Sequence, residues 1–187
     1  MINKNLLMKY LLLLFFLTTS IFAQKEGQNF CKGTTDGSYF PLDIQKKKIV
    51  WYNTYYYETL EGDKVLKGKT YVAFKQQWQD GSNSMIYFRE ANGKVLQYEE
   101  CCSAETIRWK QSLKKGENWQ NEDKTDTVLY TLLSEDAVLK TPYCHYTGLM
   151  ALQAQYAKST YVFYYLRGLG YVGATEDGKV ISFIVLQ

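Results

Sequence analysis

Short runs of alternating hydrophobic and polar residues fill most of this chain, and turn-forming residues separate them. The clearest case is residues 85–99, where the runs MIYFRE and VLQYE flank a turn that contains Asn92-Gly93. An Asn-Gly pair takes the positive backbone angles of a tight hairpin with little strain, so this stretch predicts two antiparallel strands. Similar runs predict strands at 49–57, 70–78, 107–113, 127–133, 137–140, 160–166, 171–175 and 180–186, and Asp177-Gly178 predicts a second hairpin turn between the last two.

The run at 49–57 (IVWYNTYYY) is unusual because it carries aromatic residues at nearly every position. Alternation along one continuous strand would place Trp51, Tyr55 and Tyr57 on one side and Tyr52 and Tyr56 on the other. A strand with one face in water has no need of aromatic residues on both faces. We therefore expect this strand to be covered on both sides or to line a cavity.

Two further stretches bear on the count of strands. Residues 107–113 alternate Ile107 and Trp109 against Arg108 and Lys110, which predicts a half-buried strand. Residues 148–158 (GLMALQAQYAK) suit a helix by propensity, but a strand follows directly, so we favour a strand while keeping the helix as the alternative.

These patterns predict a mainly β protein with little helix. The nine or ten expected strands lie at short, regular spacing, which is typical of an antiparallel meander that curves into a half-barrel or barrel-like sheet. The 17 tyrosines and 9 phenylalanines agree, since aromatic residues favour strands. We expect one β domain over 38–187, with Pro41 marking an edge segment that leads into it.

The first residues have the layout of a secretory signal peptide. Basic Lys4 and Lys9 precede an apolar run, and Ala23 ends a small-residue cleavage pattern, which predicts a signal over residues 1–23. A loose polar lead is expected over residues 24–37. We therefore expect a periplasmic or secreted protein; no cysteine stands at the cleavage point, so a lipoprotein is not expected.

The charge balance argues against nucleic acid as a partner. Removing the signal takes two of the 22 basic residues and none of the 19 acidic ones, which leaves a net charge of +1. A nucleic-acid binder would carry a basic stripe and a strongly alkaline balance. The only basic run, Lys46-Lys47-Lys48, is expected to be a solvated turn.

Four cysteines, Cys31, Cys101, Cys102 and Cys144, would form disulfides in an oxidising compartment. Three full pairings are possible. Adjacent cysteines rarely bond to each other, so we favour pairings in which Cys31 and Cys144 each meet one of Cys101 and Cys102. A metal site built from these cysteines and His145 lacks the usual zinc spacing, so no metal is expected.

The order of several short motifs resembles that of a broad group of uncharacterised exported bacterial β-rich proteins. The motifs stand at 39–42 (YFPL), 51–52 (WY), 87–96 (YFREANGKVL), 113–119 (LKKGENW) and 164–172 (YYLRGLGYV). The resemblance covers nearly the whole predicted domain and implies a curved antiparallel sheet, with no established activity and no catalytic residue to carry over. This chain departs from the pattern where residues 45–48 (QKKK) replace the usual glycine.

Catalytic motifs are not evident in the sequence. His145 is the single histidine, and on an extended chain it points away from its neighbour Cys144, so the two would not form a nucleophile and base pair. Neither a nucleophile elbow, nor a zinc-protease motif, nor a phosphate-binding glycine loop is present. We expect a protein that is not an enzyme and uses no cofactor.

The aromatic excess is the strongest functional lead. Aromatic residues often fill cores, and that alternative remains open. The sharper hypothesis is a concave, aromatic-rich sheet that binds a small or apolar ligand, with candidate residues Trp51, Tyr55, Tyr57, Trp109 and Tyr164. The other functional hypothesis is a protein partner: an inhibitor or immunity protein of a periplasmic toxin or hydrolase, making contact through loop 99–106.

Overall fold

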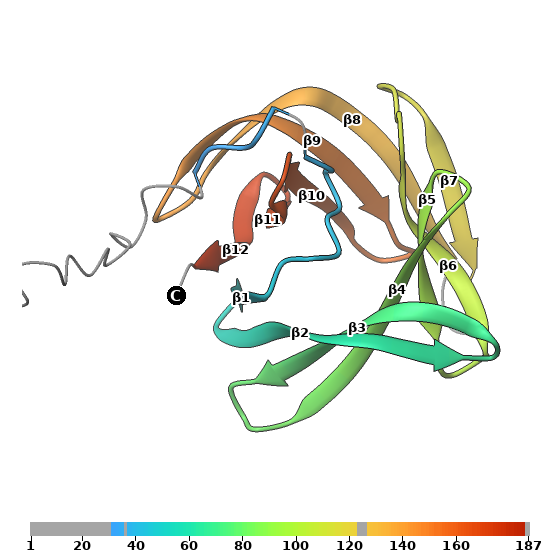
Figure 1. Cartoon of the computed structure of the whole chain (residues 1–187). Coiled ribbons are helices and arrows are strands. Elements are labelled where there is room, and N and C mark those ends of the chain that lie inside the picture. Colours follow the sequence, from blue (N-terminus) through green and yellow to red (C-terminus); the bar gives the residue numbers. More distant parts are fainter. Residues whose placement is uncertain (1–30, 36, 123–126, 186–187) are drawn as a thin grey trace, which may run out of the picture.

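The structure, a computed structural model, describes residues 31–35, 37–122 and 127–185, and these residues are all strand, turn or loop. The predicted signal over 1–23 and the first part of the predicted lead lie outside the described residues. Twelve strands form one antiparallel sheet that curves into a nearly closed barrel (Figure 1), so the predicted fold class is confirmed. The strands are β1 (Lys46–Trp51), β2 (Thr54–Leu66), β3 (Lys69–Trp78), β4 (Asn83–Ala91), β5 (Lys94–Glu99), β6 (Ala104–Lys110), β7 (Asn118–Glu122), β8 (Thr127–Lys140), β9 (His145–Gln155), β10 (Thr160–Leu166), β11 (Gly170–Glu176) and β12 (Lys179–Val185).

The strand order is that of two meanders joined at their ends. It runs β6-β5-β4-β3-β2-β1-β12-β11-β10-β9-β8-β7, so the first and last strands of the chain pair with each other. β6 and β7 follow one another in sequence but lie at opposite ends of the backbone ladder. The barrel closes there through side chains: the Asn121 amide donates to the Ile107 carbonyl (2.8 Å) and accepts from its N–H (3.1 Å), and the Trp119 indole donates to the same carbonyl (3.0 Å).

The hairpins follow the turn residues in the sequence. Asn92 and Gly93 connect β4 to β5 with φ angles of 51° and 69°, and Asp177 and Gly178 connect β11 to β12 with 50° and 76°. Both turns are confirmed, because two consecutive residues with positive φ match the twist of a two-residue hairpin. Residues 148–155 are part of β9, so the strand is confirmed over the helix.

The prediction of one strand over 49–57 was wrong. Tyr52 and Asn53 form a turn, in which Tyr52 takes a φ of 51°, and the chain reverses so that Trp51 pairs with Thr54. Across such a pair the side chains share a face, so Trp51 lies on the same side as Tyr56. Contrary to the prediction, Trp51 therefore does not share a face with Tyr55 and Tyr57. It shares a face with Tyr56, which the prediction had placed on the opposite side.

Three other elements differ from the prediction. Residues 127–140 form one long strand, β8, whose register shifts around Ser134 and Ala137 absorb the polar residues expected to break it. Residues 118–122, where no strand was predicted, form β7. β2 continues to Leu66, beyond the predicted end at residue 57, and Glu61 is its extra residue, because Leu60 pairs with Phe74 and Gly62 pairs with Ala73. β-bulges allow a strand to continue through residues that do not fit the regular ladder.

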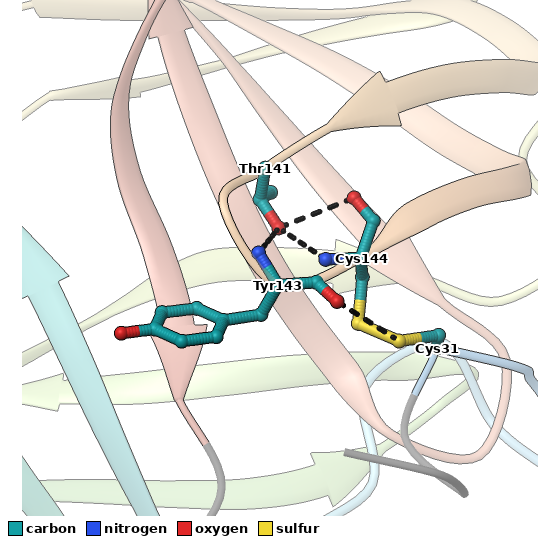
Figure 2. Close-up of a disulfide and its surroundings, with 4 residues drawn as sticks. All are labelled: Cys31, Thr141, Tyr143 and Cys144. Carbon is teal, nitrogen blue, oxygen red and sulfur yellow. Dashed lines mark hydrogen bonds between the residues drawn. A yellow bond between two sulfur atoms is a disulfide. The ribbon is translucent and has the colours of Figure 1, made fainter.

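The segment before β1 is tied to the barrel. A disulfide joins Cys31 to Cys144, whose Cα atoms are 5.3 Å apart, in the connection between β8 and β9. Figure 2 shows how the Thr141 hydroxyl shapes this connection by accepting from the N–H of Cys144 (3.0 Å). Thr34 then donates its N–H to the Arg167 carbonyl (3.0 Å). In Figure 1 the segment continues across the space that the strands enclose before it reaches β1.

The cysteine pairing favoured from the sequence is not the one found. Cys31 bonds to Cys144, and Cys101 bonds to its neighbour Cys102 in the turn between β5 and β6. The reason is topological: the β5–β6 turn lies at one end of the strand order, whereas the segment that carries Cys31 packs beside Arg167 and the β8–β9 connection.

Within the part of the chain that is described, no helix is long and apolar enough to cross a membrane.

Candidate functional site

Inside the barrel lies a cavity of about 280 Å³ that is partly open to solvent, and its volume is close to the lower limit of ordinary small-molecule sites. Its walls come from β1–β6, β8, β10 and β11 and from the segment that precedes β1. The lining residues are Phe40, Pro41, Leu42, Ile44, Lys47, Ile49, Trp51, Tyr56, Glu58, Phe74, Gln76, Ile86, Phe88, Gln97, Arg108, Tyr130, Tyr156, Phe163, Tyr165, Gly170 and Tyr171.

Aromatic rings form much of the apolar wall. Trp51 stacks on Phe163 across the barrel, with ring centroids 6.4 Å apart and an angle of 25° between the planes. Phe88 meets Phe40 edge to face at 5.2 Å and Phe74 at 6.0 Å. These rings can cover an apolar ligand body without needing polar partners of their own.

The segment before β1 contributes directly to this wall. Phe40, Pro41, Leu42 and Ile44 all line the cavity, and Phe40 also packs against Tyr165 at 6.0 Å. The backbone is held by the N–H of Gly168, which donates to the Ser38 carbonyl (2.7 Å). The segment that the sequence indicated only as an edge therefore covers part of the barrel interior.

The cavity also contains charged groups. Lys47 is buried and donates to the Leu169 carbonyl; burial lowers its pKa to about 8, although the Glu58 carboxylate acts in the opposite direction. Glu58 accepts a hydrogen bond from the Gln76 amide (3.1 Å). A charge inside a protein is costly unless it is paired or hydrogen-bonded, so these two hydrogen bonds offset part of the cost of burying Lys47 and Glu58.

The third charged group, Arg108, enters the barrel at a β-bulge. Leu96 on β5 pairs with Ile107 and the preceding Val95 pairs with Trp109, so Arg108 is the extra residue of β6. A bulge redirects side chains at that point of the strand. As a result Arg108 lines the cavity while its neighbour Trp109 packs in the core, only 3% exposed.

Tyrosine hydroxyls surround the guanidinium. Arg108 Nη1 donates to the Tyr130 hydroxyl (3.1 Å). Burial raises the pKa of Tyr156 to about 12 and raises those of Tyr56 and Tyr165 above their usual range. These hydroxyls therefore stay protonated at any physiological pH and remain able to donate hydrogen bonds.

One polar atom in the same wall has no partner. The Gln97 amide oxygen is buried and makes no hydrogen bond to any described residue. Buried polar groups are nearly always satisfied, so an unsatisfied one in a cavity wall calls for an explanation. An amide presents either its oxygen or its NH₂ group to a ligand, depending on how it turns.

A second arginine shows what a fully paired guanidinium looks like in this protein. Arg89, on the outer face, contacts both carboxylate oxygens of Glu105, with Nη2 2.8 Å from Oε2, and Tyr71 and Lys69 donate to the same carboxylate. The Arg89 hydrogen bonds hold the pKa of Glu105 at about 2, against the effect of burial. Arg89 thus has a carboxylate partner for its guanidinium, whereas Arg108 makes a single hydrogen bond to a hydroxyl.

Of the five ligand-binding candidates from the sequence, Trp51 lines the cavity. Tyr55 and Tyr57 project from the other face of the sheet, where Lys48 lies 4.0 Å from the centre of the Tyr55 ring. Trp109 is a core residue packed on Tyr165 at 4.8 Å. Tyr164 is partly buried, and its hydroxyl lies 3.4 Å from that of Thr175.

Sequence reasoning missed the polar residues of the cavity. Lys47 belonged to a run expected to be a solvated turn, and Arg108 to the outer face of an alternating strand. Glu58 and Tyr56 were displaced by the missed turn at Tyr52. Asn53 could have indicated the turn, since turns favour asparagine. No residue near Arg108 indicates the bulge in the same way.

Groups of three or more histidine, cysteine, aspartate or glutamate side chains that would hold a metal do not occur among the described residues. His145 is exposed at the start of β9.

Comparison with protein-family models, with curated proteins and with solved structures finds no match to this chain.

Proposed function

We propose that this protein binds a small, partly apolar ligand inside its barrel without catalysing a reaction. The observation that carries the proposal is the cavity inside the barrel, whose wall combines aromatic residues with a few charged and hydroxyl-bearing ones. Small-molecule sites have this composition: mostly apolar walls with a few polar groups that fix orientation.

The polar groups favour a binding site over a core that simply packs poorly. An apolar cavity can persist empty, whereas buried charges and unsatisfied amides are costly without partners. Lys47, Glu58 and Arg108 all line this one space, and so does Gln97, whose buried amide oxygen has no hydrogen-bond partner. A bound molecule would supply the missing contacts.

The fold suits a carrier or a receptor for small molecules in the cell envelope, consistent with the export expected from the sequence. The disulfide from Cys31 to Cys144 fixes the start of the segment whose residues around Phe40 would cover part of the ligand.

Non-denaturing mass spectrometry of the protein, purified gently from its native envelope extract, tests this function. We expect a non-covalent adduct in the small-molecule mass range, which organic solvent removes. The variant Ile86→Trp fills the cavity, because Ile86 lies in its wall, and should abolish the adduct.

The matched control is Val65→Trp, which adds the same side chain at a position that is 66% exposed on β2. This variant should keep the adduct at the wild-type level. A bare wild-type protein that also takes up none of a panel of small amphiphiles would overturn the proposed function.

A further inference from the structure

The charges in the cavity wall do not balance. Lys47 and Arg108 are cationic and Glu58 is anionic, so the lining has one excess positive charge. Glu99, at the end of β5, also acts electrostatically on Arg108 but does not line the cavity, and its carboxylate accepts a hydrogen bond from the Thr106 hydroxyl (2.7 Å). Neither ion pair found among the described residues includes Arg108.

Arg108 has most of its hydrogen-bonding capacity free. A guanidinium carries five N–H donors and stays protonated in proteins, yet within the described chain it makes one hydrogen bond, to Tyr130. Arg89 shows the alternative in the same molecule, with two parallel contacts to one carboxylate. The planar fork of Arg108 is left without such an acceptor.

Neutral donors lie around the same point. Tyr56, Tyr156 and Tyr165 line the cavity together with Arg108 and interact electrostatically with it, and Gln97, whose amide oxygen is unsatisfied, is part of the same wall. On the remaining wall, Trp51, Phe163 and other rings offer no polar atoms that an anion could use, apart from the Trp51 indole N–H. The cavity is therefore amphipathic, with one cationic, hydroxyl-rich part and one aromatic part.

We propose that the ligand is a monocarboxylate with a compact apolar body, held by the Arg108 fork together with tyrosine hydroxyls while its body lies against the aromatic wall. This inference rests on the proposed function and names the class of its ligand. It follows from the single excess charge, the unfilled guanidinium and the amphipathic lining.

A carboxylate fits these features better than other anions. Its two oxygens match the guanidinium fork in two parallel hydrogen bonds, and its single charge equals the excess in the wall. A phosphate monoester carries more charge than one unit at neutral pH and would bring an uncompensated charge into a cavity of about 280 Å³. A neutral amphiphile would leave Arg108 unpaired.

The test compares octanoate with 1-octanol, which have the same apolar body and differ in the charged group. Titration calorimetry on the wild-type protein should give roughly 10- to 100-fold tighter binding of octanoate, the range expected when hydrogen bonds to a charged group are gained. In Arg108→Met this preference should fall to near parity.

Lys110→Met is the matched control, since Lys110 is two residues further along the same strand and does not line the cavity. It should keep the wild-type preference for octanoate. Should Arg108→Met fail to fold, the comparison of the two probes on the wild-type protein still decides the matter, with octyl phosphate as a third probe.

The outcomes separate this inference from the function on which it rests. If wild-type protein binds neither octanoate nor octanol, the proposed function fails. If it binds both equally well, the function stands and the carboxylate assignment is overturned. Tighter binding of octyl phosphate than of octanoate also overturns the assignment, as does an undiminished preference in folded Arg108→Met.

Discussion

At the scale of single residues, the position of a side chain relative to one bulge or one turn decides its role. Arg89 on β4 and Arg108 on β6 belong to the same sheet, with only β5 between their strands, yet the first is paired with Glu105 on the outer face and the second lines the cavity. Lys47 and Lys48 are adjacent in sequence, yet the first is buried and the second lies over the Tyr55 ring.

Because Lys47 is buried, we expect the free energy of unfolding to increase with pH. Burial lowers the pKa of Lys47 in the folded protein to about 8, below the ordinary lysine value of 10.5 that the unfolded chain keeps. Between these two values the unfolded chain holds a proton that the folded protein lacks, so the free energy of unfolding increases with pH. We expect a gain of roughly 1–3 kcal/mol across the window in wild type relative to Lys47→Met.

Urea unfolding at several pH values from about 7 to about 9.5 measures this difference before ionisation of exposed tyrosines complicates the comparison. Lys48→Met is the control and should follow the wild-type curve. Parallel curves for wild type and Lys47→Met would show that burial does not impose this cost on Lys47.

At the scale of elements, the segment before β1 is as important to the cavity as any strand. It lacks regular structure, but Phe40, Pro41 and Leu42 form part of the cavity wall, and its start is fixed by the disulfide from Cys31 to Cys144. A covalent anchor is useful here, because the segment has no ladder hydrogen bonds, and a few contacts such as those of Ser38 and Phe40 offset only part of the entropy lost on ordering it.

Replacing Cys31 and Cys144 together by serine should therefore destabilise the protein. The bridge spans 113 residues, and removal of a native disulfide that closes a long loop costs about 2–5 kcal/mol. Thermal unfolding followed by circular dichroism measures the loss. The double variant Cys101→Ser/Cys102→Ser is the control, because that bridge joins adjacent residues and closes no loop.

Equal melting temperatures for the two double variants would contradict this account of the anchor. A lower melting temperature only in the Cys31/Cys144 variant, with faster loss of a bound ligand, would link the covering segment to retention of the ligand.

At the scale of the whole molecule, two closures turn an open meander into a barrel. The first is the backbone pairing of β1 with β12, which brings the two ends of the domain together. The second, between β6 and β7, uses the side chains of Asn121 and Trp119 in place of a backbone ladder. The cavity exists because both closures hold.

Asn121→Ala should loosen the second closure. The substitution removes two hydrogen bonds to Ile107 and leaves its N–H without an acceptor, at a cost of about 1–3 kcal/mol. Hydrogen exchange should show faster exchange of the Ile107 amide, and urea unfolding should show the lower stability.

Asn118→Ala, on the same strand but exposed, is the matched control and should leave both measurements unchanged. Unaltered exchange at Ile107 in Asn121→Ala would mean that backbone packing alone keeps β6 beside β7.

The sequence by itself determined the β class, the curved meander and the hairpins at Asn92 and Asp177, because alternation and turn residues act locally. It also picked out Trp51 as a candidate for the binding face. The tertiary structure decided the partner of each cysteine, the joining of β1 to β12 and the inward direction of Arg108. These depend on contacts between residues far apart in the chain and on a bulge that shifts the register by one residue. Local sequence patterns carry no information about either. The polar residues that line the cavity could therefore be identified only from the folded structure.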